Sequence, residues 1–170
     1  MNSDKPEKFD IGNVAILPAQ EEDFAEIRVL FRDGLDEGLV PDNDTGADIE
    51  ILREAYLPED GHSNFWVAKH NDYVIGMVGV QKTSPDAAEI RRLRVRKGYR
   101  RKGVGAKLME EALGFCQVQH YLKIILDVRI EREPAIKLFE KFGFQHSRSR
   151  EVNGRKMLDF YVDLYREPGS

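Results

Sequence analysis

A short run of basic residues and glycines has the composition of a phosphate-binding turn. Residues 100–106 read Arg-Arg-Lys-Gly-Val-Gly-Ala, between an apolar run typical of a strand and an amphipathic run typical of a helix. Glycines let backbone N–H groups approach a ligand closely, and the first N–H groups of a helix have no partner within it. We therefore expect this turn to bind an anion, with the Arg and Lys side chains adding hydrogen bonds to phosphate oxygens.

Two other phosphate-binding fingerprints do not match this turn. The chain contains no Gly-x-x-x-x-Gly-Lys-Ser/Thr string. Gly103 and Gly105 start the dinucleotide fingerprint, but Leu108 stands where its third glycine is required. A turn with a purely structural role is the alternative interpretation.

Positive charge is concentrated around the same turn. The chain has 26 basic and 30 acidic residues, for a net charge of −4. Residues 91–102 hold eight basic residues and no acidic one, so the rest of the chain carries −12. This distribution favours binding of a compact anion over a nucleic-acid surface, where basic residues are usually spread over a basic domain. A nucleic-acid-binding strip and a solvated charged edge are the alternatives.

Composition predicts one soluble, cytoplasmic domain. The 170 residues are 41% hydrophobic, enough for a core, and no apolar run approaches the roughly 18 residues of a membrane span. The polar start lacks a signal-peptide pattern. Cys116 stands alone, and the four histidines lack metal-ligand spacing and are expected on the surface or in loops, so we predict no metal site. We expect a loose lead-in over 1–12, the domain over 13–165 and a tail over 166–170.

The elements that position this turn follow from hydrophobic periodicity. Alternating and continuous apolar runs predict strands over 14–17, 65–68, 73–80, 88–95, 123–128, from 144 onward, and 156–164. Apolar residues at spacings of three and four predict helices over 24–35, 49–56, about 103–119 and 134–142. Cys116 is expected to be buried in the third of these. The order predicts an α/β fold in which a mixed sheet carries helices on both sides.

The turn and its surroundings resemble the GNAT superfamily of acyl-CoA-dependent N-acetyltransferases. The signature of that family is Arg/Gln-x-x-Gly-x-Gly/Ala between a strand and a helix, and residues 100–105 match it fully. Residues 88–95, Ala-Glu-Ile-Arg-Arg-Leu-Arg-Val, are similar to its central strand. Residues 134–144, which end in Gly-Phe, resemble its last helix. The resemblance covers roughly residues 65–164.

The resemblance implies an acetyl-CoA site between two splayed parallel strands. Strands 89–95 and 123–128 would separate, and the pantetheine arm would pair with backbone groups of Leu93, Arg94 and Val95. The pyrophosphate would be held by the turn, which is formed by Arg100, Arg101, Lys102, Gly103, Val104, Gly105 and Ala106. The side chains of Leu93 and Val95 are expected to pack in the core.

Glu89 is the candidate general base, because family members that use a glutamate often carry it in an Ala-Glu-Ile string on this strand. An amine acceptor arrives protonated and must lose a proton before it attacks a thioester. A carboxylate can remove that proton, and burial would raise the pKa of the carboxylate toward the neutral range in which a general base works best. Pairing of Glu89 with a nearby arginine is the alternative.

The chain departs from the family pattern at two positions. Phe139 stands where many members carry a tyrosine that protonates the leaving thiolate. Many members also carry an asparagine that contacts the CoA arm near the position of Arg132, and this chain lacks it. A thiol pKa of about 8.5 makes a thiolate a fair leaving group without an acid. Tyr121, Tyr161 or water could replace the tyrosine. We still expect both Phe139 and Arg132 to contact the cofactor.

The function implied by the resemblance is transfer of an acetyl group from acetyl-CoA to a primary amine, by direct attack in a ternary complex. We expect no nucleic-acid or membrane partner, and a monomer or homodimer. A non-catalytic acyl-CoA-binding module is the alternative, favoured by Phe139. The first helices and the loop that joins them should form the acceptor site. Acidic residues in that stretch favour a cationic acceptor; they are Asp36, Glu37, Asp42, Asp44 and Asp48.

Overall fold

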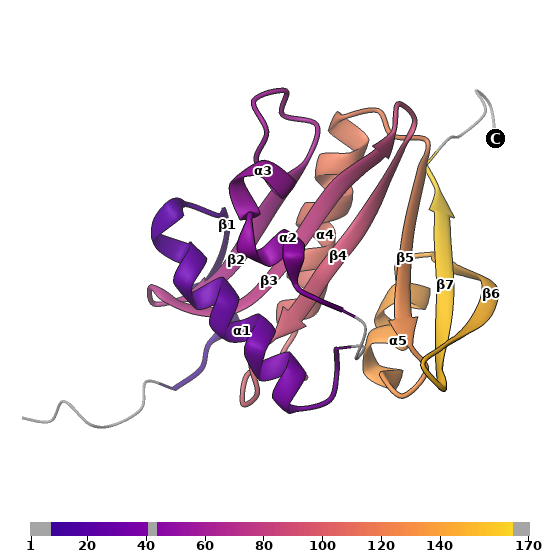
Figure 1. Cartoon of the computed structure of the whole chain (residues 1–170). Coiled ribbons are helices and arrows are strands. Elements are labelled where there is room, and N and C mark those ends of the chain that lie inside the picture. Colours follow the sequence, from indigo (N-terminus) through magenta and orange to yellow (C-terminus); the bar gives the residue numbers. More distant parts are fainter. Residues whose placement is uncertain (1–7, 41–43, 165–170) are drawn as a thin grey trace, which may run out of the picture.

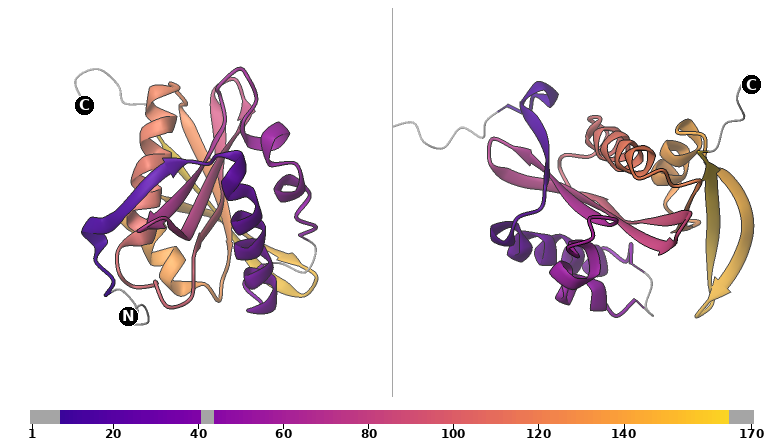
Figure 2. Two further views of the ribbon diagram at one scale, coloured as in Figure 1. Left: turned by 90° about the vertical axis from the view of Figure 1, so that its left-hand side faces the viewer. Right: turned by 90° about the horizontal axis from the view of Figure 1, so that it is seen from above.

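Seven strands form one mixed sheet in the order β1-β2-β3-β4-β5-β7-β6, with helices on both faces (Figures 1 and 2). The computed structural model describes residues 8–40 and 44–164. The strands are β1 (Val14–Pro18), β2 (Asn64–His70), β3 (Tyr73–Ser84), β4 (Ala87–Val95), β5 (Lys123–Arg129), β6 (Gln145–Val152) and β7 (Arg155–Asp163). The helices are α1 (Phe24–Asp36), α2 (Ala47–Glu50), α3 (Leu52–Tyr56), α4 (Val104–Val118) and α5 (Glu133–Lys141), with 3-10 turns η1 (Ile11–Asn13) and η2 (Glu21–Asp23). The predicted α/β fold is confirmed.

The two faces of the sheet carry separate hydrophobic clusters. Helices α4 and α5 cover one face, and Leu108, Met109 and Cys116 of α4 are fully buried there. Helices α1, α2 and α3 cover the other face, where Tyr56 packs edge-on against Phe65 with ring centroids 4.9 Å apart. Among the residues described, no helix is long and apolar enough to span a bilayer. The two hydrophobic clusters lie on opposite faces of the sheet, so a ligand bound between two strands would lie between them.

Turn chemistry sets the ends of several elements. Asn71 and Asp72 have φ of 49° and 69°, and Asn153 and Gly154 have φ of 51° and 76°. Two consecutive residues with positive φ form the tight turns that match the twist of antiparallel hairpins. Tight turns at 71–72 and 153–154 therefore connect β2 to β3 and β6 to β7.

The end of strand β2 departs from the sequence-based expectation. His70, expected on the surface or in a loop, is 5% exposed and its ring stacks on Phe9 at 5.1 Å. The backbone N–H of Asp10 donates to His70 Nε2 at 3.2 Å. Residues just before β1 therefore pack onto the sheet and bury this histidine.

Strands β4 and β5 are joined along less than half of their length. Their parallel pairing comprises Ala87 with Lys123, Ala88 with Ile124, and Glu89 with Ile125. Beyond this point β4 continues to Val95 and β5 to Arg129, and the two strands separate. The predicted splay is confirmed, and it begins at Glu89.

A bulge in β4 lies just beyond the start of the splay. The pairing of β3 with β4 shifts between Met77 and Gly79, opposite Arg92, whose φ is 63°. A left-handed conformation at a residue with a long side chain costs of order 1–3 kcal/mol and persists only where its surroundings hold it. The backbone of β4 therefore changes direction at Arg92.

The Arg92 side chain supplies the interactions that hold the bulge. Its guanidinium, 8% exposed, binds both carboxylate oxygens of Asp44 and both of Asp48. The same group lies over the Phe31 ring, 4.9 Å from its centroid. Tyr56 also donates to Asp48, at 2.5 Å. The bulge is thereby tied to the helices of the opposite layer.

Replacing Asp48 with Asn is expected to lower the free energy of unfolding at neutral pH by about 1.5–3 kcal/mol, because it weakens hydrogen bonds to a charged group. Burial raises the pKa of Asp48, but hydrogen bonds from Arg92 and Tyr56 lower it by more, so the pKa is about 2. The folded-state pKa lies below the unfolded value, so this stabilisation is present above about pH 4 and is lost as the pH falls toward about 2.

Denaturant unfolding of wild type and Asp48→Asn at about pH 7, 4 and 2.5 measures this dependence. Asp36→Asn, at an exposed acid of α1, is the control and should unfold like wild type. A difference between wild type and Asp48→Asn that stays constant over this range would contradict the assignment.

Candidate active site

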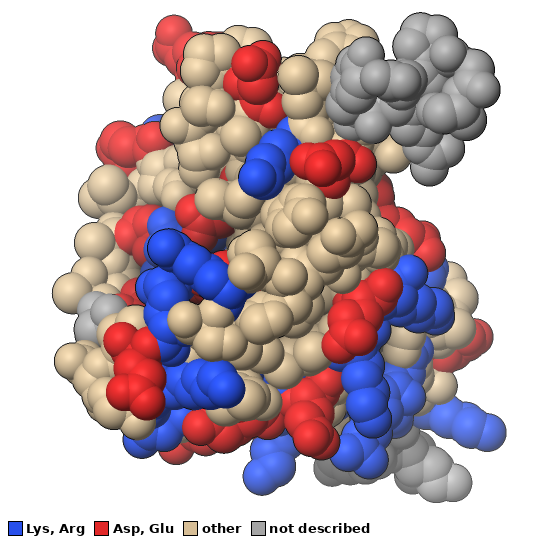
Figure 3. All heavy atoms as spheres, turned by 90° about the vertical axis from the view of Figure 1, so that its right-hand side faces the viewer, with Lys and Arg blue, Asp and Glu red and all other residues tan. Residues whose placement is uncertain are grey.

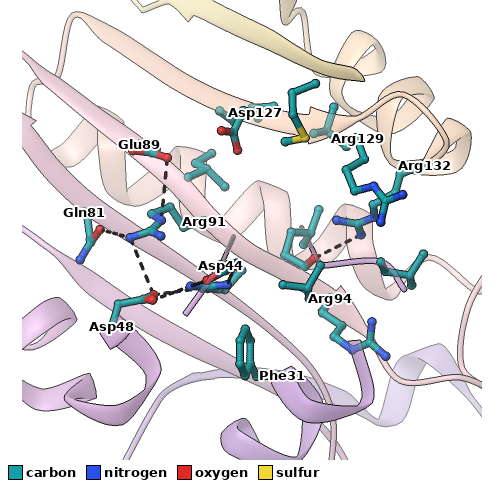
Figure 4. Close-up of a pocket in the computed structure, with 18 of the residues that line it drawn as sticks. Phe31, Asp44, Asp48, Gln81, Glu89, Arg91, Arg94, Asp127, Arg129 and Arg132 are labelled. Carbon is teal, nitrogen blue, oxygen red and sulfur yellow. Dashed lines mark hydrogen bonds and ion pairs between the residues drawn. The ribbon is translucent and has the colours of Figure 1, made fainter. Parts of the chain in front are cut away.

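The splay opens into a pocket of about 710 Å³ on the side of the sheet that faces α1, α2 and α3 (Figure 4). This volume lies in the range typical of small-molecule sites. Its lining combines the separated parts of β4 and β5 with the first helices and the start of α5. The charged residues that line it are Asp44, Asp48, Glu89, Arg91, Arg92, Arg94, Asp127, Arg129, Arg132 and Arg150.

Glu89 lies at one end of this pocket, at the last paired position of β4, with its side chain 28% exposed. Burial raises the pKa of Glu89; nearby Arg91 lowers it, and the charge of Asp127 on β5 raises it again. Arg91 Nε is 3.8 Å from Glu89 Oε1, too far for a hydrogen bond, whereas Arg91 Nη1 donates to Gln81 at 2.8 Å. The carboxylate of Glu89 is therefore free to accept a proton from another group.

The glycine turn has the conformation that a close approach of a ligand requires. Arg101 and Gly103 have φ of 61° and 88°, and Gly103 is the N-cap of α4. The N–H groups of Val104, Gly105 and Ala106 are the first of this helix, where amides lack partners within the helix and the helix dipole favours an anion. Nothing is within 3.4 Å of a Cβ built at Gly103, so its φ, not crowding, requires glycine.

Most of the basic run does not lie at this turn, contrary to the interpretation drawn from its charge. Five of its eight basic residues pair with acids of the layer formed by α1 and α2: Arg91 and Arg92 with Asp48, Arg94 and Arg100 with Glu37, and Arg96 with Glu26. Lys97, Arg101 and Lys102 are exposed. Basic and acidic side chains are likewise interspersed around β6 and β7 (Figure 3). The partners were not evident because they lie 43–70 residues away in sequence.

The predicted cofactor-binding residues of β4 and α5 lie around the splay. Arg132, which precedes α5, donates from Nη2 to the carbonyl of Leu93 at 3.4 Å, so that carbonyl faces the gap. Arg100 Nε donates to the carbonyl of Val95 at 2.9 Å. Phe139 is buried and lines the pocket, with its ring 6.1 Å from that of Phe144. The side chains of Leu93 and Val95 pack against the core, as expected.

The two tyrosines considered as proton donors do not line this pocket. Tyr121 is buried, and its hydroxyl donates to the carbonyl of His62 at 2.5 Å. The hydroxyl of Tyr161 on β7 donates to Gln145 at 3.2 Å, and Tyr161 lines a second, smaller pocket that also includes Glu89. No structural observation therefore favours either tyrosine over water as the acid.

Arg129 is a pocket residue that the sequence analysis did not single out. Its side chain is 5% exposed, and its Nη1 donates to the carbonyl of Gly38 in the segment after α1. Ile124, Leu126 and Val128 of β5 face the α4 core, so Asp127 and Arg129 face the other side. This alternation of apolar and polar residues along 124–129 could have identified Arg129 as a residue of the acceptor side.

Comparison with known proteins gives a consistent assignment. Residues 26–144 match the family model described as the acetyltransferase (GNAT) family. An N-acetylaspartate synthetase from Xenopus tropicalis is 34% identical over 100 residues, which are 58% of this chain and 36% of that protein. The chain spans about a third to a half of the length of the first curated relatives that it matches.

Solved structures share the fold. A GCN5-related N-acetyltransferase from Kribbella flavida superposes with a TM-score of 0.80 at 18% identity, over 91% of this chain and all of the other. A Salmonella typhimurium acetyltransferase determined with its cofactor acetyl-CoA superposes with a TM-score of 0.75 at 14% identity, over 91% of this chain and 96% of the other. With the family model matching well over half of its residues, the chain belongs to the acetyltransferase (GNAT) family.

Proposed function

We propose that this chain transfers an acetyl group from acetyl-CoA to a primary amine by direct attack within a ternary complex. The observation that carries the proposal is the end of β4–β5 pairing at Glu89 and Ile125 while both strands run on. Unpaired strand edges expose backbone N–H and C=O groups that an amide-containing arm can bond. The carbonyl of Leu93, which already accepts a side-chain donor across the gap, is one such group.

The residues around the gap suit a CoA thioester. The amides at the start of α4, with Arg101 and Lys102 exposed beside them, offer donors for a diphosphate. A structural neighbour of the same fold was determined with acetyl-CoA as its cofactor. Bound acetyl-CoA would supply an activated acyl group. Backbone N–H groups between Leu93 and Val95 would stabilise the negative charge that develops on the acyl oxygen, a role in which fixed donors have large effects.

Glu89 supplies the proton acceptor in this proposal. Burial and the charge of Asp127 raise its pKa, which makes the carboxylate a stronger base than an exposed glutamate. It would take the proton of the ammonium form of the acceptor, directly or through water, and leave the amine lone pair free to attack. Phe139 has no proton to give, so the thiolate of CoA would leave unprotonated and take a proton from water.

One relative guides the choice of acceptors to test. The name of the N-acetylaspartate synthetase relative refers to an N-acetylated amino acid, which places amino acids in the first panel of amines to test.

Release of free thiol from acetyl-CoA over a panel of amines is the experiment that tests the function. We expect release that depends on both an amine and the protein, above the rate of uncatalysed hydrolysis. Binding of acetyl-CoA without amine-dependent thiol release would instead support a non-catalytic acyl-CoA-binding module.

Replacing Glu89 with Gln is expected to lower the rate by about 10²–10⁴-fold near neutral pH, the usual contribution of a general base. The loss should diminish as the pH rises toward the pKa of the amine, because more acceptor is then already neutral. The pH–rate profiles of wild type, Glu89→Gln and the exposed-site control Glu110→Gln measure this effect. A folded Glu89→Gln variant with wild-type rates at all pH values would remove Glu89 from the mechanism.

Replacing Gly103 with Val is expected to weaken acetyl-CoA binding about tenfold or more, since valine does not readily adopt a φ of 88° and its side chain would block the amides. Titration calorimetry measures the affinity, and circular dichroism checks the fold. Gly154→Val, in the β6–β7 turn with φ of 76° and open space around it, is a control of similar backbone strain. Equal affinities of the two folded variants would show that the turn does not bind the cofactor.

A further inference from the structure

Positive charge predominates at one end of the pocket. Glu89 and Asp127 lie at one end, and Arg129 and Arg132 lie together at the other, with Arg94 nearby (Figure 4). Arg132 has no ion pair with any described residue. Burial lowers the pKa of Arg132, and the positive charges of Arg94, Arg100 and Arg129 lower it further, to about 10. An arginine held among other arginines favours an anion beside it.

Three of the five acidic residues expected to attract a cationic acceptor pair with arginines of the strand region. Asp44 and Asp48 pair with Arg92, and Glu37 pairs with Arg94 at 2.7 Å and with Arg100 at 2.8 Å. Asp42 lies outside the described residues. Asp36 is exposed at the end of α1 and does not line the pocket. The described carboxylates of the helices and loop on this side that line or border the pocket are therefore paired, which disfavours a cationic acceptor.

Two buried arginines of the pocket retain unused hydrogen-bonding capacity. The side chains of Arg129 and Arg94 are 5% and 6% exposed, and among the described residues the Nε atom of each has no hydrogen-bond partner. Glu131, the acid nearest Arg129, is 3.5 Å away and 55% exposed, so solvent weakens that pair. Buried charged groups normally have their hydrogen bonds satisfied, and an anion in the pocket would satisfy these.

The diphosphate of the cofactor is not the anion that Arg129 would bind. The amides proposed for the diphosphate are at the start of α4, which covers one face of the sheet. Arg129 bonds Gly38, directly after α1, and so lies on the opposite face. That face contains Glu89, and an acceptor must place its amine there.

We infer that the acceptor is an amine that carries a carboxylate, and that Arg129 binds this carboxylate while the amine faces Glu89. The inference rests on the proposed function and names the acceptor class for the same site. Arg129 acts on specificity: it fixes the end of the acceptor that does not react. Nη1 bonds Gly38 and Nε lies 3.5 Å from Glu131 Oε2, so Nη2 is the donor open to the carboxylate. Nε completes the paired hydrogen bonds that guanidinium and carboxylate groups favour when the exposed Glu131 side chain turns toward solvent.

Thiol release with matched pairs of amines tests the acceptor class. Glycine, β-alanine, L-aspartate and L-glutamate are compared with their carboxamides, and putrescine and spermidine represent cationic amines. The carboxamides are less basic at nitrogen, so any intrinsic bias favours them. We expect kcat/KM roughly 10- to 100-fold higher for the best carboxylate than for its carboxamide, the size of a hydrogen bond to a charged group.

The outcomes separate the two proposals. Amine-dependent release that is equal for acids and amides, or highest with the polyamines, would overturn the carboxylate inference and leave the acetyl transfer intact. Absence of release with every amine would overturn both. Titration of N-acetylated products against the CoA-loaded protein gives a readout apart from turnover, and the carboxylate products should bind more tightly than their amides.

Variants of Arg129 test its assignment. Arg129→Gln should raise the KM for the carboxylate acceptor roughly 10- to 100-fold and leave the KM for its carboxamide unchanged, and Arg129→Lys should recover part of the loss. Arg53→Gln, at an exposed residue of α3 outside the pocket, is the control. Equal changes for acid and amide would show that Arg129 only holds the Gly38 segment. If Arg129→Gln does not fold, the same comparison is made with Arg129→Lys.

Discussion

The contact between the Arg92 guanidinium and the carboxylates of Asp44 and Asp48 is the constraint on which the site depends. Arg92 holds a left-handed backbone conformation in the middle of a strand, and such a conformation persists only where the surroundings favour it. The two carboxylates come from the start of α2 and the segment before it, 44 and 48 residues earlier. One buried cluster thus sets the direction of β4 and positions the helices over the pocket, so the acceptor side and the cofactor side are folded together.

The sequence was sufficient to predict the features that local chemistry controls. Asn71-Asp72 and Asn153-Gly154 are turns because these residue types tolerate positive φ. Gly103 ends a loop and caps α4 for the same reason. The splay and the role of Glu89 were predicted from a resemblance to a family. Both predictions depended on the correct placement of the strand at residues 88–95. The splay is now observed, whereas the role of Glu89 stays a prediction.

What sequence could not give is the pairing of charges over long separations. The basic run from Arg91 to Lys102 suggested a single anion-binding strip, yet five of its eight basic side chains pair with acids of the first helices. Three of the five lie on β4, and the other two follow that strand. His70 was misplaced for a related reason, because its burial depends on Phe9, which is 61 residues away. Alternation along β5 could place Arg129 on the pocket side of the sheet, but its contact with Gly38, 91 residues earlier, could not be predicted from that pattern.

The short junction between β4 and β5 has a mechanical consequence. Three residue pairs connect the sheet formed by β1 to β4 with the one formed by β5, β7 and β6. Backbone pairing is sparser at this junction than between any other two neighbouring strands. Helix α5 packs against the smaller half through Phe139, whose ring is 6.5 Å from that of Phe160 on β7. In the proposed complex, a cofactor arm that bonds both free edges would act as a missing strand and would couple the unfolding of the two halves. Bound acetyl-CoA would then contribute to the stability of the sheet as well as to the reaction.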